Sequence, residues 1–169
     1  MEFGILYFLQ SLRTPWLDAF MKGITGLGDH GIFWIITGSV LLCFKKTRTA
    51  GLCVIFSLAA GYIAGNTVLK NLVARERPCW IDTGVPLLVR NPRDYSFPSG
   101  HTLSAFEGSV SIWLYHRRWG VPFLILAGLI AFSRMYLFVH FPTDILGGMI
   151  LGILIARLVR CGLERAGVS

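Results

Sequence analysis

The chain has 169 residues, of which 54% are hydrophobic and only 15% are charged, and its formal net charge is +7. The length fits one domain, and the composition is too apolar for an ordinary soluble globular protein. Much of the positive charge lies in short loops and near the C-terminus, which fits the positive-inside bias of membrane proteins and argues against nucleic-acid binding. The sequence therefore predicts an all-α, multi-pass membrane protein in which residues 1–169 form one membrane-embedded domain.

The N-terminal residues 1–29 mix apolar and charged side chains. Arg13, Asp18 and Lys22 interrupt the apolar positions, and Pro15 breaks the run. This pattern favours two short helices that lie in the membrane interface. The alternative prediction is a first membrane-spanning helix over residues 3–27.

Five apolar runs follow and predict a bundle of about five membrane-spanning helices within residues 30–160. The predicted spans lie near residues 30–45, 51–75, 100–116, 119–137 and 142–160. Basic clusters follow the first, third and fifth spans, so all three clusters fall on one side, predicted to be the cytoplasm. The clusters are Lys45, Lys46 and Arg48; His116, Arg117 and Arg118; and Arg157, Arg160 and Arg165.

Two glycine pairs predict close helix packing inside the bundle. Gly61 and Gly65 are four residues apart in the second predicted span, and Gly148 and Gly152 have the same spacing in the fifth. Small residues at this spacing allow two helix backbones to approach closely.

A first cluster of polar residues ends the second predicted span. Lys70 and Arg77 are seven residues apart, or two helical turns, so we expect both to project from one helix face. Pro78 is expected to end the helix. Two fixed cations can bind separate oxygens of a phosphate group. The alternative is that both side chains merely extend to the membrane interface.

A second cluster, Pro98-Ser99-Gly100-His101, opens the third predicted span. Ser99 suits the N-cap position of a helix. The following backbone N–H groups then point at any anion bound there, and Gly100 allows that anion to approach closely. His101 would stand in the first turn, where it can donate a proton to a leaving oxygen.

A third cluster joins the fourth and fifth predicted spans and contains Ser133, Arg134, His140 and Asp144. Pro142 suits the first turn of a helix, so Asp144 can reach back to the imidazole of His140. A carboxylate on one ring nitrogen fixes the tautomer and leaves the lone pair of the other nitrogen exposed. His140 is therefore a candidate nucleophile, and Arg134 supplies a third cation.

No metal or other cofactor is predicted. Histidine and aspartate are suitable metal ligands, but Lys70, Arg77 and Arg134 would repel a divalent cation and attract an anion. The four cysteines have no spacing typical of a metal site or a disulfide framework.

Together the three clusters resemble the motifs of the type 2 phosphatidic acid phosphatase family of integral membrane lipid phosphatases. The pattern is K-x6-RP, PSGH and SR-x5-H-x3-D, and it matches in order at residues 70–78, 98–101 and 133–144. The resemblance covers residues 51–160, and residues 1–29 carry no motif. It implies that His140 is the nucleophile, that Asp144 orients it and that His101 is the acid. It also implies phosphate-binding roles for Lys70, Arg77, Ser99, Gly100 and Arg134.

The resemblance implies hydrolysis of a membrane lipid's phosphate or pyrophosphate through a phosphohistidine intermediate. Undecaprenyl pyrophosphate, phosphatidylglycerol phosphate and phosphatidic acid are the expected substrate classes. An active site on the non-cytoplasmic side of the plasma membrane favours the polyprenyl pyrophosphate by analogy. A lipid phosphotransferase of the same fold and a non-enzymatic anion-binding membrane protein are the alternatives. The sequence does not predict a role for Glu107 or for the loop 79–97.

Overall fold

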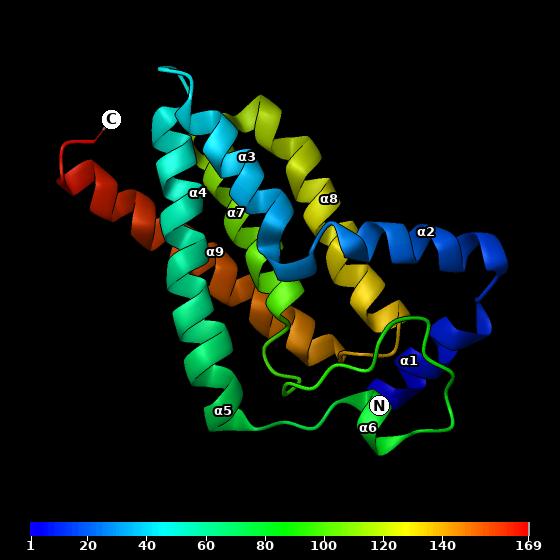
Figure 1. Ribbon diagram of the computed structural model, residues 1–169. Coiled ribbons are helices and arrows are strands. Elements are labelled where there is room, and N and C mark those ends of the chain that lie inside the picture. Colours follow the sequence, from blue (N-terminus) through cyan, green and yellow to red (C-terminus); the bar gives the residue numbers. More distant parts are fainter. Residues whose placement is uncertain (169) are drawn as a thin grey trace.

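The computed structural model describes residues 1–168, and all of its regular elements are helical (Figure 1). Two short helices come first, followed by the helices of the bundle. Their bounds are α1 (Glu2–Ser11), α2 (Pro15–Gly26), η1 (Asp29–Gly31), α3 (Ile32–Leu42), α4 (Arg48–Gly61), η2 (Tyr62–Leu69), α5 (Lys70–Val73), α6 (Pro78–Ile81), α7 (Gly100–Tyr115), α8 (Arg117–Tyr136) and α9 (Pro142–Arg165).

Helix α7 is the centre of the bundle. It packs against α8 on one side and against α9 and α4 on the others, and α3 packs against α4. Its buried residues include small and polar side chains, among them Thr102, Ser109 and Ser111. The hydroxyl oxygen of Ser111 lies 3.3 Å from that of Ser57 on α4. The helix that carries the second motif is therefore surrounded by the rest of the bundle.

Three segments are long and apolar enough to cross a membrane: Arg48–Ile81, Arg117–Tyr136 and Pro142–Arg165. A helix needs about 20 residues to cross the hydrocarbon layer. Helix α3 has 11 residues and α7 has 16, so both are shorter than that. The helical, membrane-spanning character of the chain agrees with the prediction, whereas the count of five spans stays a prediction.

The glycine pairs lie where helices approach most closely. A Cβ atom on Gly148 would sit 2.8 Å from the backbone oxygen of Ser99, and one on Gly152 would sit 2.9 Å from that of Leu103. These contacts join α9 to α7 and confirm the packing predicted for this pair. In the other pair, a Cβ atom on Gly61 would meet the side chain of Glu107, and one on Gly65 would meet the side chain of Leu103, both on α7.

The two N-terminal helices predicted within residues 1–29 are present as α1 and α2, and both pack against α8. Thr14 caps α2 by accepting a hydrogen bond from the backbone N–H of Leu17. The hydroxyl of Tyr136, at the end of α8, donates to Asp18 over 2.6 Å. Their position in the membrane interface stays a prediction.

The two ends of the bundle carry different polar segments. In the view of Figure 1, the α3–α4 and α7–α8 connections and the C-terminal end of α9 lie at the upper end. These are the places of the three basic clusters. Helices α5 and α6 and the turn between α8 and α9 lie at the lower end. The three motifs and the basic clusters therefore occupy opposite ends of the molecule.

The close contact of α9 with α7 predicts that Gly152→Ala destabilises the protein by about 1–3 kcal/mol, because the added methyl group must displace backbone atoms of α7. The measurement is thermal unfolding of the purified protein in detergent. Gly128→Ala on α8 is the matched control, since a Cβ atom there would meet nothing within 4 Å. An equal change in melting temperature for both variants would contradict this account of the packing.

Candidate active site

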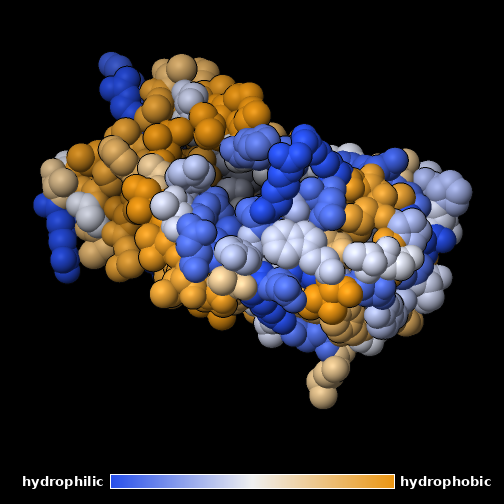
Figure 2. Space-filling view, turned by 60° about the horizontal axis from the view of Figure 1, so that its bottom comes forward, coloured by the Kyte–Doolittle hydropathy of each residue, from blue (hydrophilic) through white to orange (hydrophobic). Residues whose placement is uncertain are grey.

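A cavity of about 1410 Å³ opens at the lower end of the bundle and brings the three motifs together. Figure 2 shows this end, where hydrophilic side chains surround a hollow and hydrophobic side chains cover the flanks. Six residues singled out from the sequence line the cavity: Lys70, Arg77, Gly100, His101, Arg134 and His140. Ser99 and Asp144 are fully buried behind its wall.

Three of the cavity's cations are almost completely buried. Lys70 and Arg134 are each 6% exposed, and Arg77 is 2% exposed. Burying a single charge is costly unless a partner compensates it. Three positive charges buried around one cavity are therefore stable only if negative charge lies in the cavity or at its edge.

The expectation that Lys70 and Arg77 share one helix face is wrong. The helix ends at Val73, Ala74 adopts a left-handed conformation with φ of +46°, and Arg77 has an extended backbone. The expectation that Pro78 ends this helix is also wrong, because the helix stops at Val73 and Pro78 stands in the first turn of α6. Both side chains nevertheless reach the cavity, one from α5 and the other from the N-cap of α6.

Asp94 in the loop before α7 binds both of these cations. Its Oδ2 pairs with Nζ of Lys70, and its Oδ1 accepts from Nη2 of Arg77 over 2.9 Å. Burial raises the pKa of Asp94, but the hydrogen bond from Lys70 and the charges of both cations outweigh this and hold its pKa at about 2. An ionised carboxylate therefore occupies donors that an anionic ligand would use.

His140 is buried in the turn between α8 and α9, where Phe138 takes a left-handed conformation with φ of +61°. Its Nε2 lies 3.0 Å from Nη1 of Arg77. A guanidinium group can only donate, so Nε2 is the acceptor and the ring proton is assigned to Nδ1. Nδ1 lies 3.4 Å from the hydroxyl oxygen of Ser96 and 3.5 Å from Oδ2 of Asp144.

The protonation state of His140 follows from the same surroundings. Burial lowers its pKa well below the usual value, and the positive charges of Arg77, Arg134 and Lys70 lower it further. A buried imidazole beside cations favours the neutral form. His140 is thus a neutral base whose lone pair lies on the cavity side.

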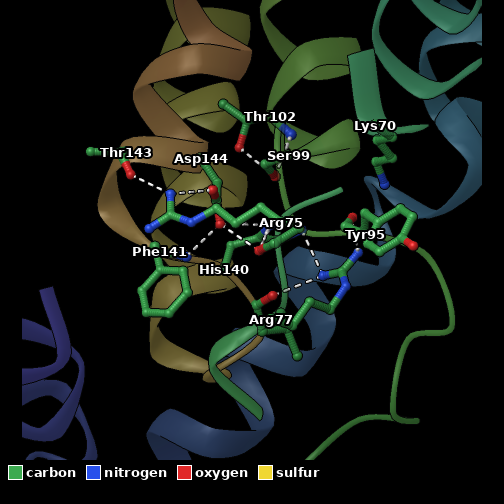
Figure 3. A network of polar contacts seen from close by, with 12 residues as sticks. Lys70, Arg75, Arg77, Tyr95, Ser99, Thr102, His140, Phe141, Thr143 and Asp144 are labelled. Atoms are coloured by element: carbon green, nitrogen blue, oxygen red, sulfur yellow. Dashed lines mark hydrogen bonds and ion pairs between the residues drawn. The ribbon is translucent and has the colours of Figure 1, made fainter. Parts of the chain in front are cut away.

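Asp144 is held by several donors in the first turn of α9 (Figure 3). Its Oδ2 accepts from the hydroxyl of Ser96 over 2.5 Å and from the backbone N–H of Phe141 over 2.8 Å. Its Oδ1 accepts from Nη1 of Arg75 over 2.8 Å. The predicted neighbourhood of Asp144 and His140 is present, although their separation of 3.5 Å is longer than a normal hydrogen bond.

Arg134 reaches the cavity from the last turn of α8. Its Nη1 donates to the hydroxyl of Thr25 on α2 over 2.6 Å. Its Nε is buried and has no hydrogen-bond partner within residues 1–168. A buried guanidinium donor without a partner is costly, and an anion in the cavity can relieve that cost.

Ser99 is the N-cap of α7, as predicted, with its side chain accepting from the backbone N–H of Thr102. Its own N–H donates to the backbone oxygen of Asp144 over 3.1 Å, which ties the second motif to the third. His101 stands in the first turn, and its Nε2 lies 2.8 Å from Oδ1 of Asp29. Two turns deeper, Glu107 lines the same cavity, and its buried Oε1 has no partner within the described residues.

Several residues around the site were not singled out by the sequence motifs: Thr25, Asp29, Arg75, Ser96 and Asp94. Arg75 gave one signal, because a cation on the predicted non-cytoplasmic side goes against the positive-inside trend. Thr25 and Asp29 lie in the N-terminal segment that carries no motif, so only the folded chain reveals their contacts.

The donor set suits an anion better than a metal ion. Within residues 1–168, no three histidine, cysteine, aspartate or glutamate side chains gather in a way that could hold a metal. The cavity instead combines three buried cations with the N-terminus of α7. Charged donors and a helix N-terminus together bind phosphate groups well.

Comparison with known proteins gives the class of this molecule. Residues 50–167 match the PAP2 superfamily, and the chain belongs to that family. It is 37% identical over 120 residues to an undecaprenyl-diphosphatase of Sulfolobus acidocaldarius, which covers 70% of this chain and 58% of that protein. It is 35% identical over 164 residues to phosphatidylglycerophosphatase B of Bacillus subtilis, which covers 88% of this chain and 76% of that protein.

Solved structures agree with this assignment. The crystal structure of a transmembrane PAP2-type phosphatidylglycerolphosphate phosphatase from Bacillus subtilis matches with a TM-score of 0.78 at 31% identity, covering 96% of this chain and 84% of that one. The structure of Aquifex aeolicus LpxE matches with a TM-score of 0.73 at 27% identity, covering 94% and 93%. The family resemblance seen in the motifs is thereby confirmed, and these relatives are named as phosphatases of lipid phosphates.

The contacts of Asp94 predict that Asp94→Asn binds inorganic phosphate about threefold to tenfold more tightly, because Lys70 and Arg77 lose a competing carboxylate. Titration calorimetry of the purified protein with phosphate measures the change. Asp82→Asn is the matched control in the same loop, since Asp82 contacts Tyr7 and Gly84 rather than the cations. Weaker phosphate binding by Asp94→Asn would show that Asp94 supports the anion site instead of competing for it.

Proposed function

We propose that this chain is a metal-independent phosphatase that removes a phosphate or pyrophosphate head group from a membrane lipid through a phosphohistidine intermediate. The observation that carries the proposal is the neutral, buried imidazole of His140 beside three buried cations in one cavity. An anion-binding protein needs the cations alone. A lone pair among them adds the means to attack the phosphorus atom.

In the first step, Nε2 of His140 attacks phosphorus in line with the leaving oxygen. Substrate oxygens replace Asp94 on Lys70 and Arg77, which also releases Nε2 from its hydrogen bond with Arg77. The Nδ1 proton stays on the ring, facing Ser96 and Asp144. A nitrogen–phosphorus bond forms as the phosphorus–oxygen bond breaks.

His101 acts as the general acid for the leaving group. As that bond breaks, His101 donates a proton to the departing oxygen, which leaves as an alcohol or, from a pyrophosphate, as a lipid phosphate. The neutral imidazole next takes a proton from water, which attacks phosphorus and releases His140. Each turnover returns both histidines to their starting states.

The cations supply most of the acceleration in this scheme. Phosphoryl transfer needs little covalent help from a protein and depends on positioning and on stabilising charge at the equatorial oxygens. Lys70, Arg77 and Arg134, with the N–H groups of Gly100 and His101, provide that charge. Nε of Arg134, which has no hydrogen-bond partner among residues 1–168, can donate to one of these oxygens.

The lipid class follows from the rest of the cavity. Part of its wall is apolar and includes Ile35, Ile55, Leu58 and Leu103, which suits the first part of a lipid tail. The relatives act, by their names, on undecaprenyl diphosphate and phosphatidylglycerophosphate. We infer a substrate from these classes or phosphatidic acid, with the site on the non-cytoplasmic face of the plasma membrane.

His140→Ala is expected to reduce phosphate release by roughly three orders of magnitude or more, because the substitution removes the proposed nucleophile. The measurement is inorganic phosphate released from lipid phosphates by the purified protein in detergent. His116→Ala is the control, since His116 lies at the opposite end of the bundle and should retain activity. Near-normal turnover by folded His140→Ala protein would rule out its role as nucleophile.

Chelation tests the metal-independent part of the proposal. Activity is expected to remain within about twofold after dialysis against EDTA, because the three cations neutralise the charge that a metal ion would otherwise neutralise. Complete loss of activity, restored by added Mg²⁺, would contradict this.

A further inference from the structure

The short element η1 forms one wall around His101. A Cβ atom on Gly28 would lie 2.7 Å from Cδ2 and 3.3 Å from Cγ of that ring, so the imidazole rests directly on the backbone of Gly28. The next residue, Asp29, places its Oδ1 2.8 Å from Nε2 of His101. The ring thus packs against Gly28 and is bonded at one nitrogen by Asp29, which lie 73 and 72 positions earlier in the chain.

This wall lies outside the part of the chain that matches the PAP2 superfamily, which begins at residue 50. Nearby, Thr25 in the last turn of α2 accepts a hydrogen bond from the buried guanidinium of Arg134. The end of α2 and the segment between α2 and α3 are therefore part of the site's construction.

The surroundings of His101 create a difficulty for its role as an acid. Burial of the ring disfavours a second proton on the imidazole most strongly, and positive groups that reach the same cavity from several elements disfavour it further. The cations are Arg134 on α8, Lys70 on α5, Arg77 before α6, and Lys22, Arg90 and Arg93 along the rim. The other imidazoles are those of the neutral His140 in the α8–α9 turn and of His30, and the acidic groups are Asp29, Asp94 and Glu107. Of the acidic groups, Asp94 is bound to Lys70 and Arg77.

We propose that Asp29 is a positioning residue that favours the protonated form of His101 and directs its Nδ1–H toward the leaving oxygen. The carboxylate accepts from Nε2–H, so Nδ1 is the nitrogen available to the substrate. During the first step the Nδ1 proton passes to the departing oxygen, and during the second Nδ1 takes a proton from water. Asp29 stays ionised throughout and transfers nothing.

The state of Asp29 supports this role. Its hydrogen bond with His101 lowers its pKa, partial burial raises it, and the result lies below the ordinary value. The carboxylate is thus ionised at every pH at which the site would work. A negative charge 2.8 Å from the ring offsets the surrounding cations where the compensation is needed.

The inference rests on the proposed phosphatase activity, and Asp29→Asn tests it. This variant keeps the shape of the side chain and removes its charge. We expect kcat at pH 8 to fall about tenfold to a hundredfold, with KM within about threefold. The alkaline limb of the kcat profile should move to lower pH by about one unit, because His101 loses its proton more easily. Asp18→Asn, in α2, is the matched control and should leave the profile unchanged.

Two further measurements separate this role from a structural one. In a His101→Ala background, Asp29→Asn should cause less than a twofold further loss, because its effect acts through His101. The leaving group of an aryl phosphate needs no acid, so with this substrate the decrease in kcat caused by Asp29→Asn should be about twofold or less.

The outcomes distinguish the two proposals. If the wild-type protein releases no phosphate from any lipid phosphate or aryl phosphate, the proposed function fails and this inference fails with it. If the wild type is active and Asp29→Asn shows the wild-type rate and pH profile, only this inference is overturned. The inference is also overturned if Asp29→Asn lowers kcat equally in the wild-type and His101→Ala backgrounds, since Asp29 would then act on the fold rather than through His101.

Discussion

The burial of three cations around one imidazole is the constraint on which the rest of the structure depends. Lys70, Arg77 and Arg134 are nearly inaccessible to water, and they come from three different segments. Mutual repulsion opposes such an arrangement unless anions compensate it. Asp94 compensates two of the cations at the cavity. Nε of Arg134 has no partner within the described residues, and a phosphate oxygen can accept its hydrogen bond.

The helix bundle holds this arrangement by contacts between backbones rather than by flexible side chains. Gly148 brings α9 against the backbone of Ser99, and the N–H of Ser99 donates to the backbone oxygen of Asp144. The start of α7, which carries His101, and the start of α9, which follows His140, are therefore fixed to one another. A catalytic arrangement held in this way needs little reorganisation when charge develops during reaction.

Local sequence patterns predicted the parts of the fold and site that depend on local chemistry. The apolar runs located α4, α8 and α9, and the Pro-Ser-Gly-His sequence predicted the N-cap at Ser99. The spacing of Gly148 and Gly152 predicted a close helix contact by α9, although not which helix it meets. The helical spacing of Lys70 and Arg77 gave a wrong prediction, because Ala74 adopts a left-handed conformation that no local sequence pattern predicted.

The contacts missed by sequence reasoning join distant segments. Asp29 meets His101 across 72 residues, and Thr25 meets Arg134 across 109. Neither residue belongs to a motif, and an aspartate beside glycine in a short connection is typical of many turns. Their partners are decided by how α2 packs against α8, which is a property of the folded bundle.

The central claim is that Nε2 of His140 carries the phosphoryl group during turnover. The most direct measurement is to stop the reaction in alkali during steady-state turnover of a lipid phosphate and to map the phosphorylated residue by mass spectrometry and phosphorus NMR. The account predicts phosphate on Nε2 of His140, since Nδ1 faces Ser96 and Asp144. Phosphate on Nδ1, on His101 or on no residue of an actively turning-over enzyme would contradict it.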